Sequence, residues 1–174
     1  ATLSFTLDQD SRIETNNVRD EFNAIAYNNS DGTLPWLADW EEISDDGNTG
    51  GGDVRVVNRW NAYVLQMDRN QSGASRLTDL SSYTNAVLSF DYRRFGTIDA
   101  TEYLAIWASS NGGTDWTELG RIYGANVNDA TTLATNVDMS AYIATNTAVR
   151  FVIGGGASNG EGFRLDNIDI TVTK

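Results

Sequence analysis

Hydrophobic residues recur at every second position along much of this 174-residue chain, and this period of two constrains its fold more than any other feature. Successive side chains of a β-strand point to opposite faces, so the pattern buries one face of each strand and exposes the other. It predicts strands at residues 2–7, 86–93, 103–108, 149–153 and 168–172. The segment closest to a helical pattern, residues 128–143, is rich in poor helix formers.

Clusters of Gly, Asn, Asp and Ser separate the predicted strands, as is typical of turns in antiparallel sheets. The clearest clusters are residues 28–32, 44–53, 111–113 and 154–162. The sequence has no internal repeat, which argues against a propeller or a solenoid. The predicted fold class is therefore all-β, an antiparallel sandwich or barrel.

The length of the chain favours one domain, since all-β domains often exceed ~150 residues without dividing. Residues 1–17 are ambiguous, because they fit either an extra edge strand or a linker from a preceding module. Asn16-Asn17 is a plausible junction. We therefore assign residues 1–17 to an N-terminal strand or linker and residues 18–174 to the β-sandwich domain.

Charge and composition exclude several functions. The net charge of −12 opposes binding to nucleic acids and to anionic membranes. The chain has no His and no Cys, which excludes disulfides, zinc-thiolate sites and His-dependent catalysis. No apolar run approaches the ~20 residues of a membrane span, so we expect no membrane insertion. The abundant Asp, Asn, Thr and Ser offer oxygen ligands, which suit a hard cation such as calcium.

Paired carboxylates can hydrolyse glycosides without His. The chain has 24 acidic residues, so some carboxylates lie close together by chance, and no spacing singles out a catalytic pair. We therefore predict that the protein is not an enzyme.

Ten short segments, taken in their order along the chain, carry a resemblance to a known class of module. They are residues 18–23, 27–33, 36, 40–42, 45–47, 75–80, 88–94, 109–116, 149–151 and 160–168. Together they resemble a jelly-roll module of secreted and surface-anchored bacterial proteins, akin to MAM-like domains and to β-sandwich carbohydrate-binding modules. The resemblance covers roughly residues 18–172.

The resemblance implies an antiparallel jelly-roll β-sandwich of the concanavalin-like or galactose-binding-like kind. It also implies a non-catalytic, calcium-stabilised binding module, monomeric and part of a multidomain extracellular protein. Carbohydrate recognition, as in adhesion to a cell-surface glycan, is the leading function. The alternative is a structural spacer or protein-contact domain of a surface adhesin that binds no sugar. This architecture hosts many binding roles, so it does not specify a ligand.

The closing segment predicts a β-bulge. The hydrophobic residues Phe163 and Leu165 are at odd positions, whereas Ile168 and the alternate hydrophobic residues after it are at even positions. Odd and even positions of a regular strand point to opposite faces, so one regular strand cannot bury both sets. The bulge is expected near Asp166-Asn167. A carboxylate beside such a kink is costly unless it is paired or bound to a cation.

In modules of this resemblance, the Asp of the final strand often ligates a structural calcium together with an acidic residue after the first strand. The matching positions here are Asp166 and Glu21, with Asp20 and Asn23 as further partners. The alternative is that Asp166 pairs with an Arg or caps a turn, and that Glu21 is solvated. The acidic loop 44–53 lacks the final Glu and the helices of an EF-hand, so we interpret it as a connector.

An outward aromatic side chain marks the candidate sugar-binding face. The predicted strand 103–108 sends Leu104 and Ile106 to the core, which places Tyr103 and Trp107 outside. An exposed indole is a stacking platform for a sugar ring. We expect Asp91 and Arg93 to lie on the same face and to bind sugar hydroxyls.

The alternative is that Trp107 packs against a loop or the N-terminal strand. The other Trp residues fall in or beside predicted turns. Trp116 is expected to pack under the hairpin 109–116, which resembles an Asp-box. Trp36 and Trp40 fit core packing at least as well as binding, and Trp60 lies in or beside a loop.

Overall fold

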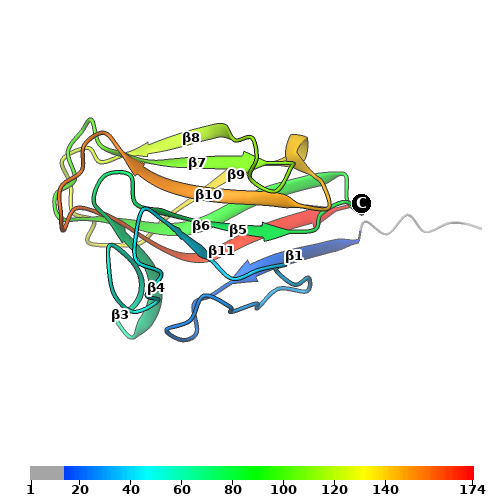
Figure 1. Cartoon of the computed structure of the whole chain (residues 1–174), viewed down its shortest axis with the longest axis horizontal. Helices are drawn as coiled ribbons and strands as arrows, with labels where there is room; N and C mark the ends of the chain where they lie inside the picture. Colours follow the sequence, from blue (N-terminus) through cyan, green and yellow to red (C-terminus); the bar gives the residue numbers. More distant parts are fainter. Residues whose placement is uncertain (1–13) are drawn as a thin grey trace, which may run out of the picture.

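The computed structural model describes residues 14–174 and places two antiparallel β-sheets face to face (Figure 1). Every pairing between strands is antiparallel, which confirms the predicted jelly-roll β-sandwich. The strand predicted at residues 2–7 lies outside the described residues. No helix among residues 14–174 is long and apolar enough to cross a membrane.

The larger sheet has six strands in the order β3-β4-β11-β6-β9, with β1 paired to β11. Its strands are β1 (Thr15–Asp20), β3 (Val54–Arg59), β4 (Ala62–Asp68), β6 (Asn85–Phe95), β9 (Leu133–Asp138) and β11 (Gly162–Thr173). β1 and β4 lie end to end along one edge of β11, because β4 pairs with its first residues and β1 with its last.

The smaller sheet has five strands in the order β2-β5-β10-β7-β8. Its strands are β2 (Glu41–Ile43), β5 (Gly73–Thr78), β7 (Tyr103–Ser109), β8 (Thr117–Tyr123) and β10 (Thr147–Gly154). A short 3-10 turn, η1 (Ser140–Tyr142), precedes β10.

The predicted bulge in the closing strand is present. The register between β11 and β6 shifts between Asp166 and Asp169, and Asn167 adopts a left-handed conformation with φ of 50°. Phe163, Leu165 and Ile168 are consequently all buried. The extra residue therefore changes the phase of the strand, as the two hydrophobic parities require.

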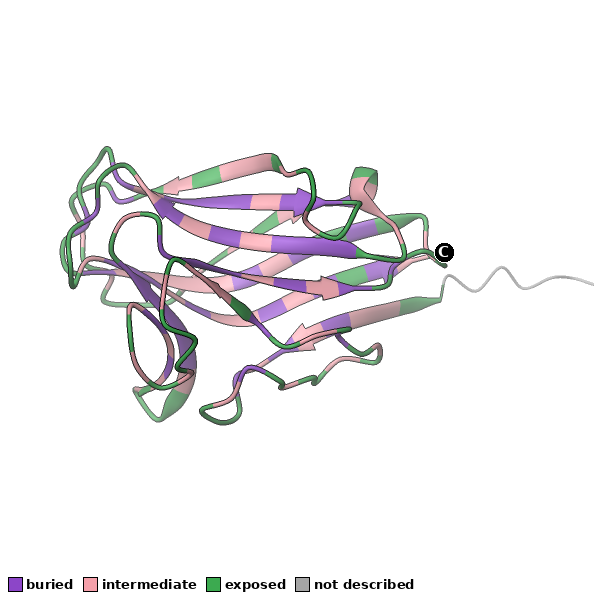
Figure 2. Cartoon of the chain, in the orientation of Figure 1, coloured by how far each residue is buried: buried purple, intermediate pink, exposed green. Residues whose placement is uncertain are grey.

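The core lies between the sheets, where alternate residues of both inner faces meet. Buried and less buried positions alternate along β10 and β11 (Figure 2). Leu104 and Ile106 are buried, which confirms the predicted inner face of β7. Trp36 and Trp40 are also buried, with ring centroids 5.6 Å apart, so these two indoles pack in the core.

A buried ion pair joins the two sheets. Asp20 at the end of β1 and Arg76 in the middle of β5 both point inward, and Arg76 Nη1 lies 2.7 Å from Asp20 Oδ2. The Trp40 indole N–H and the Phe22 backbone N–H also donate to this carboxylate, at 2.9 and 2.8 Å. The Arg76 guanidinium lies 4.8 Å from the Trp36 ring centroid.

These contacts offset the cost of burying two charges. Burial raises the pKa of Asp20, whereas its three donors lower it. Burial lowers the pKa of Arg76 to about 10, which leaves the guanidinium charged at neutral pH. Each oxygen of Asp20 has a protein donor, so the carboxylate is satisfied without a cation.

The junction proposed at Asn16-Asn17 lies inside β1, where the two residues stand opposite Val172 and Thr171 of β11. The division between residues 1–17 and 18–174 stays a prediction, because residues 1–13 lie outside the described part of the chain.

We predict that Asp20→Asn lowers the free energy of unfolding by about 3–5 kcal/mol, because it leaves the buried Arg76 charge without a counter-ion. Equilibrium urea denaturation measures this difference. The matched control is Glu21→Gln, which removes the same charge from the next residue, where the ion pair with Arg19 is partly exposed to solvent. The control loss should stay below about 1 kcal/mol. Equal losses in the two variants would contradict the prediction.

Candidate ligand-binding site

The β3–β4 hairpin carries a Trp in an unfavourable backbone conformation. Arg59 pairs with Ala62, so Trp60 and Asn61 form a two-residue turn in which both have positive φ, 55° and 66°. Such turns strongly favour Asn-Gly, because a bulky side chain is strained in the left-handed region. Trp60 nevertheless occupies the first position and leaves 57% of its surface exposed.

A pocket of about 280 Å³ lies beside this turn, on the outer face of the six-stranded sheet. The hairpin, β6 and β11 contribute its walls. Its charged and aromatic lining includes Arg59, Trp60, Asp91, Arg93, Arg164 and Asp166.

The register between β6 and β11 explains why these side chains share one face. Leu165 pairs with Tyr92 and points to the core, which sends the pairs on either side of it outward. On one side Arg93 is directly opposite Arg164, and on the other Asp91 is directly opposite Asp166. Like charges in direct cross-strand positions are destabilising, so two such pairs in succession are costly for the sheet.

The two arginines of this face contact the exposed Trp. The guanidinium carbons of Arg93 and Arg164 lie 3.9 and 5.3 Å from the Trp60 ring centroid. Arg93 Nε donates to Thr132 Oγ1 at 2.8 Å, and Arg164 Nε donates to Gln66 Oε1 at 2.9 Å. The sheet thus holds both guanidiniums in place through their Nε groups.

The two aspartates form the acidic side of the pocket. The Asn167 side-chain amide donates to Asp91 at 2.8 Å, and its backbone N–H donates to Asp166 at 2.8 Å. Burial, followed by repulsion from Asp91, Glu21 and Asp20, raises the pKa of Asp166 to about 6. The left-handed Asn167 of the bulge therefore supports both carboxylates.

This arrangement provides the groups that a small polar ligand with an apolar face needs. Trp60 offers an exposed ring for stacking, the aspartates accept hydrogen bonds, and the guanidiniums donate them. The volume lies near the lower end of the ~300–1,000 Å³ range of ligand sites, so the pocket suits a group such as a sugar ring.

The structure corrects the predicted sugar-binding face. Tyr103 and Trp107 belong to β7 in the five-stranded sheet, whereas Asp91 and Arg93 belong to β6 in the six-stranded sheet. The expectation that all four share one face is therefore wrong. Alternation along each strand predicts which side faces outward, but it does not show which strands form one sheet.

Other side chains cover the two aromatic residues of β7. The guanidinium carbon of Arg150 lies 4.8 Å from the Trp107 ring centroid and 4.2 Å from that of Trp116. Arg121 lies over the Tyr103 ring at 4.1 Å. Within residues 14–174, Trp107 thus packs against Arg150 of the neighbouring strand β10.

Three of the four predicted calcium ligands have protein partners in the described chain. Asp20 is satisfied by its three donors, and Glu21 pairs with Arg19 at 2.9 Å. The Asn23 amide donates to Asp31 Oδ1 at 2.7 Å. Asp166 does not pair with an Arg among residues 14–174, and calcium binding there stays a prediction.

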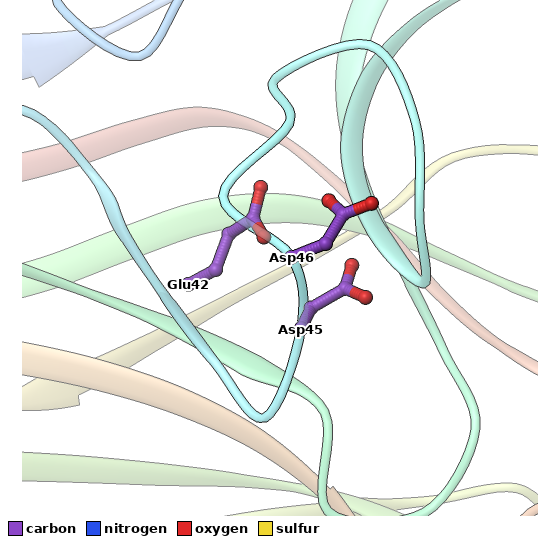
Figure 3. A group of neighbouring side chains, drawn as sticks. All are labelled: Glu42, Asp45 and Asp46. Carbon is purple, nitrogen blue, oxygen red and sulfur yellow. The ribbon is translucent and has the colours of Figure 1, made fainter.

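A different acidic group lies in the loop 44–53 and the strand before it. Glu42, Asp45 and Asp46 bring carboxylate oxygens within 4.8 Å of one another (Figure 3). Within the described residues, it is the only such group of three. Backbone N–H groups already donate to all three, from Gly47 to Glu42, from Val54 to Asp45 and from Asn48 to Asp46.

Sequence reasoning missed the role of Trp60 in the site. The only signal was weak, because apolar residues alternate at Val54 and Val56 and return at Val64, with seven residues between them. Two-residue hairpin turns usually carry Asn-Gly or Asp-Gly, so nothing in the sequence marked Trp60-Asn61 as the turn.

Comparisons with known proteins show the fold. No protein-family model matches the sequence, and a search of curated proteins finds no match. Among solved structures, a cleaved adhesin domain of Lys-gingipain from Porphyromonas gingivalis is similar, with a TM-score of 0.55 and 16% identity. The alignment covers 88% of this chain and 96% of that domain.

Two carbohydrate-binding modules are also similar in structure. The module TmCBM61, solved with β-1,4-galactotriose, has a TM-score of 0.52 and 12% identity, over 78% of this chain and 88% of that one. The CBM22-1 xylan-binding domain from Paenibacillus barcinonensis has a TM-score of 0.51 and 15% identity, over 78% and 86%. The chain therefore has the β-sandwich fold of these adhesin and carbohydrate-binding modules.

We predict that Asp166→Asn stabilises the protein increasingly as pH rises. The raised pKa of about 6 means that the folded state retains a proton that the unfolded chain loses near pH 4. In the wild-type protein, the contribution of Asp166 to the free energy of unfolding is therefore fully present below pH 4 and is lost as the pH rises through 6. Urea denaturation between pH 4 and 8, with EDTA present, gives the difference between variant and wild type. A difference that is constant with pH would contradict the prediction.

Proposed function

We propose that this chain is a non-catalytic carbohydrate-binding module of a larger extracellular protein, and that it binds sugar in the Trp60 pocket. The exposed, strained conformation of Trp60 is the observation that carries this proposal. A bulky residue with positive φ is strained and stores conformational energy, typically at a functional site. The strain holds the indole at the edge of a pocket, where a sugar ring can stack on it.

The chemistry of the pocket and the fold both support this proposal. Carboxylates and guanidiniums on either side of Trp60 supply the acceptors and donors that sugar hydroxyls require. Solved structures with this fold include a module in complex with β-1,4-galactotriose, a xylan-binding domain and an adhesin domain. The sugars named here are ligands of those proteins. For this chain, the shared fold favours the sugar-binding proposal over the spacer alternative.

The paired carboxylates of the pocket are assigned to binding rather than to hydrolysis. Glycosidases place two carboxyl groups on either side of the bond that they cleave. Asp91 and Asp166 are directly opposite on neighbouring strands and project from the same sheet face, so both approach a ligand from one side. Incubation with bound oligosaccharides should release no reducing ends.

We predict that Trp60→Asn weakens sugar binding at least about tenfold, because a central Trp contact is lost. Asn is favoured at this turn position, so the free energy of unfolding should stay within about 1 kcal/mol of wild type. A glycan array identifies the ligand, and isothermal titration calorimetry measures its affinity. This variant separates binding from folding. If Trp60 were purely structural, its replacement would lower the free energy of unfolding and would leave sugar affinity unchanged.

Trp107→Ala is the control for the opposite sheet, and its sugar affinity should match that of wild type. A loss confined to Trp107→Ala would place the site on the five-stranded sheet. The spacer or protein-contact alternative predicts no glycan binding by the wild-type protein at all.

We further propose that calcium stabilises the fold, with Asp166 and the Glu42–Asp45–Asp46 group as the two candidate sites. Oxygen-rich groups of this kind are preferred calcium ligands. The loop 44–53 connects β2 to β3, so an ion there would restrain the hairpin that carries Trp60.

We predict that EDTA lowers the melting temperature of calcium-loaded protein, because a cation that binds only the folded state stabilises it. Differential scanning calorimetry of wild type, Asp46→Asn and Asp166→Asn measures the effect. The variant that no longer responds to calcium identifies the site. An unchanged melt of wild-type protein after verified calcium removal would contradict calcium stabilisation.

A further inference from the structure

Within residues 14–174, the basic residues of the Trp60 pocket lack the counter-ions that most other arginines have. Six arginines of the described chain form ion pairs with carboxylates, namely Arg19, Arg55, Arg69, Arg76, Arg94 and Arg121. Within residues 14–174, Arg59, Arg93 and Arg164 form none, and all three line the pocket. In a chain of net charge −12, three unpaired guanidiniums at one site form an unusual local concentration of positive charge.

The strands hold two of these guanidiniums side by side. Arg93 and Arg164 are directly opposite on β6 and β11, and each is held by a hydrogen bond from Nε. Arg93 Nη1 also donates to the Ala130 carbonyl at 3.4 Å. Within the described chain, the terminal amino groups of Arg164 and Nη2 of Arg93 have no acceptor, although they are not sealed from solvent.

Burial and neighbouring guanidiniums both act on the pKa of Arg164. Burial, and then repulsion from Arg59 and Arg55, lowers the pKa of Arg164 to about 10. An anion between the guanidiniums would remove this repulsion and accept charge-assisted hydrogen bonds from the free amino groups. Arg is the residue best suited to this task, because its planar fork matches the geometry of an oxyanion.

We propose that the pocket selects an acidic sugar, whose carboxylate or sulfate group is bound by Arg93 and Arg164 while its ring stacks on Trp60. This inference rests on the proposed function and adds the ligand class. The Arg93 guanidinium already lies over the Trp60 ring, 3.9 Å from its centroid, so the sugar would stack on the ring surface that stays exposed, with its anionic group directed past the edge of the indole to the arginines.

The acidic side of the pocket orients such a ligand. Asp91 and Asp166 lie two residues along the strands from the arginine pair, a separation of about 7 Å. Their carboxylates repel an anionic group and accept hydrogen bonds from hydroxyls, so the sugar binds with its charged group toward the arginines. The net charge of the chain repels acidic polymers elsewhere on the surface, which confines their binding to this local site.

The test compares matched acidic and neutral ligands by calorimetry on the whole chain. The pairs are oligogalacturonate with its carboxyl-reduced form, and dextran sulfate oligomers with dextran. At least one acidic ligand should bind about tenfold or more tighter than its neutral match. The pair that shows the preference identifies the anion as carboxylate or sulfate.

Arg93→Gln and Arg164→Gln should each weaken acidic binding about tenfold. Arg164→Lys keeps the positive charge but loses the planar guanidinium, so it should also weaken acidic binding. It replaces Arg164→Gln as the test if that variant does not fold. The matched control is Arg121→Gln, which removes the same charge from the five-stranded sheet and should leave binding unchanged.

The outcomes separate this inference from the function on which it rests. Equal binding of acidic and neutral ligands, lost in Trp60→Asn, would overturn the acidic selectivity and support sugar binding. Equal weakening by Arg121→Gln and Arg164→Gln would show non-specific attraction and overturn the inference. Binding to no glycan at all, neutral or acidic, would overturn the proposed function itself.

Discussion

The ion pair between Asp20 and Arg76 is the contact on which the arrangement of the two sheets depends. It joins the end of β1 in one sheet to the middle of β5 in the other, where both charges are fully buried. A charge in that position is tolerated only with a partner, so any other placement of β1 or β5 leaves a costly isolated ion. Trp36 and Trp40 surround the pair and continue into the aromatic core through Phe151. The pair thus fixes a contact between the two sheets to which the aromatic core is joined.

The stability of the packed core offsets unfavourable arrangements on the outer faces of the sheets. On the six-stranded sheet, two like-charged cross-strand pairs, a left-handed Trp60 and the bulge at Asn167 all border one pocket. Each of these features costs conformational or electrostatic energy, and none of them builds the core. Their concentration at one place is typical of a functional site.

The five-stranded sheet presents a different surface. The two aromatic residues of β7 are covered, Trp107 by Arg150 and Tyr103 by Arg121, whereas Tyr123 of β8 is half exposed. The hairpin after β7 adds to this layer, because Trp116 contacts the same Arg150. Among the Trp residues of the described chain, only Trp60 is largely exposed, and this difference distinguishes the candidate site.

The sequence by itself determined the all-β class, the inner faces of four strands within residues 86–172 and the bulge before Ile168, because these follow from the parity of neighbouring residues. It also singled out Asp91, Arg93 and Asp166, which line the candidate pocket. Only the tertiary structure decided which strands share a sheet, and it moved Trp107 and Tyr103 to the opposite face from Asp91. It also decided that Asp20 pairs with Arg76 and that Trp60 borders the pocket. The physical reason is that periodicity depends on adjacent residues, whereas sheet order and charge pairing join residues far apart along the chain.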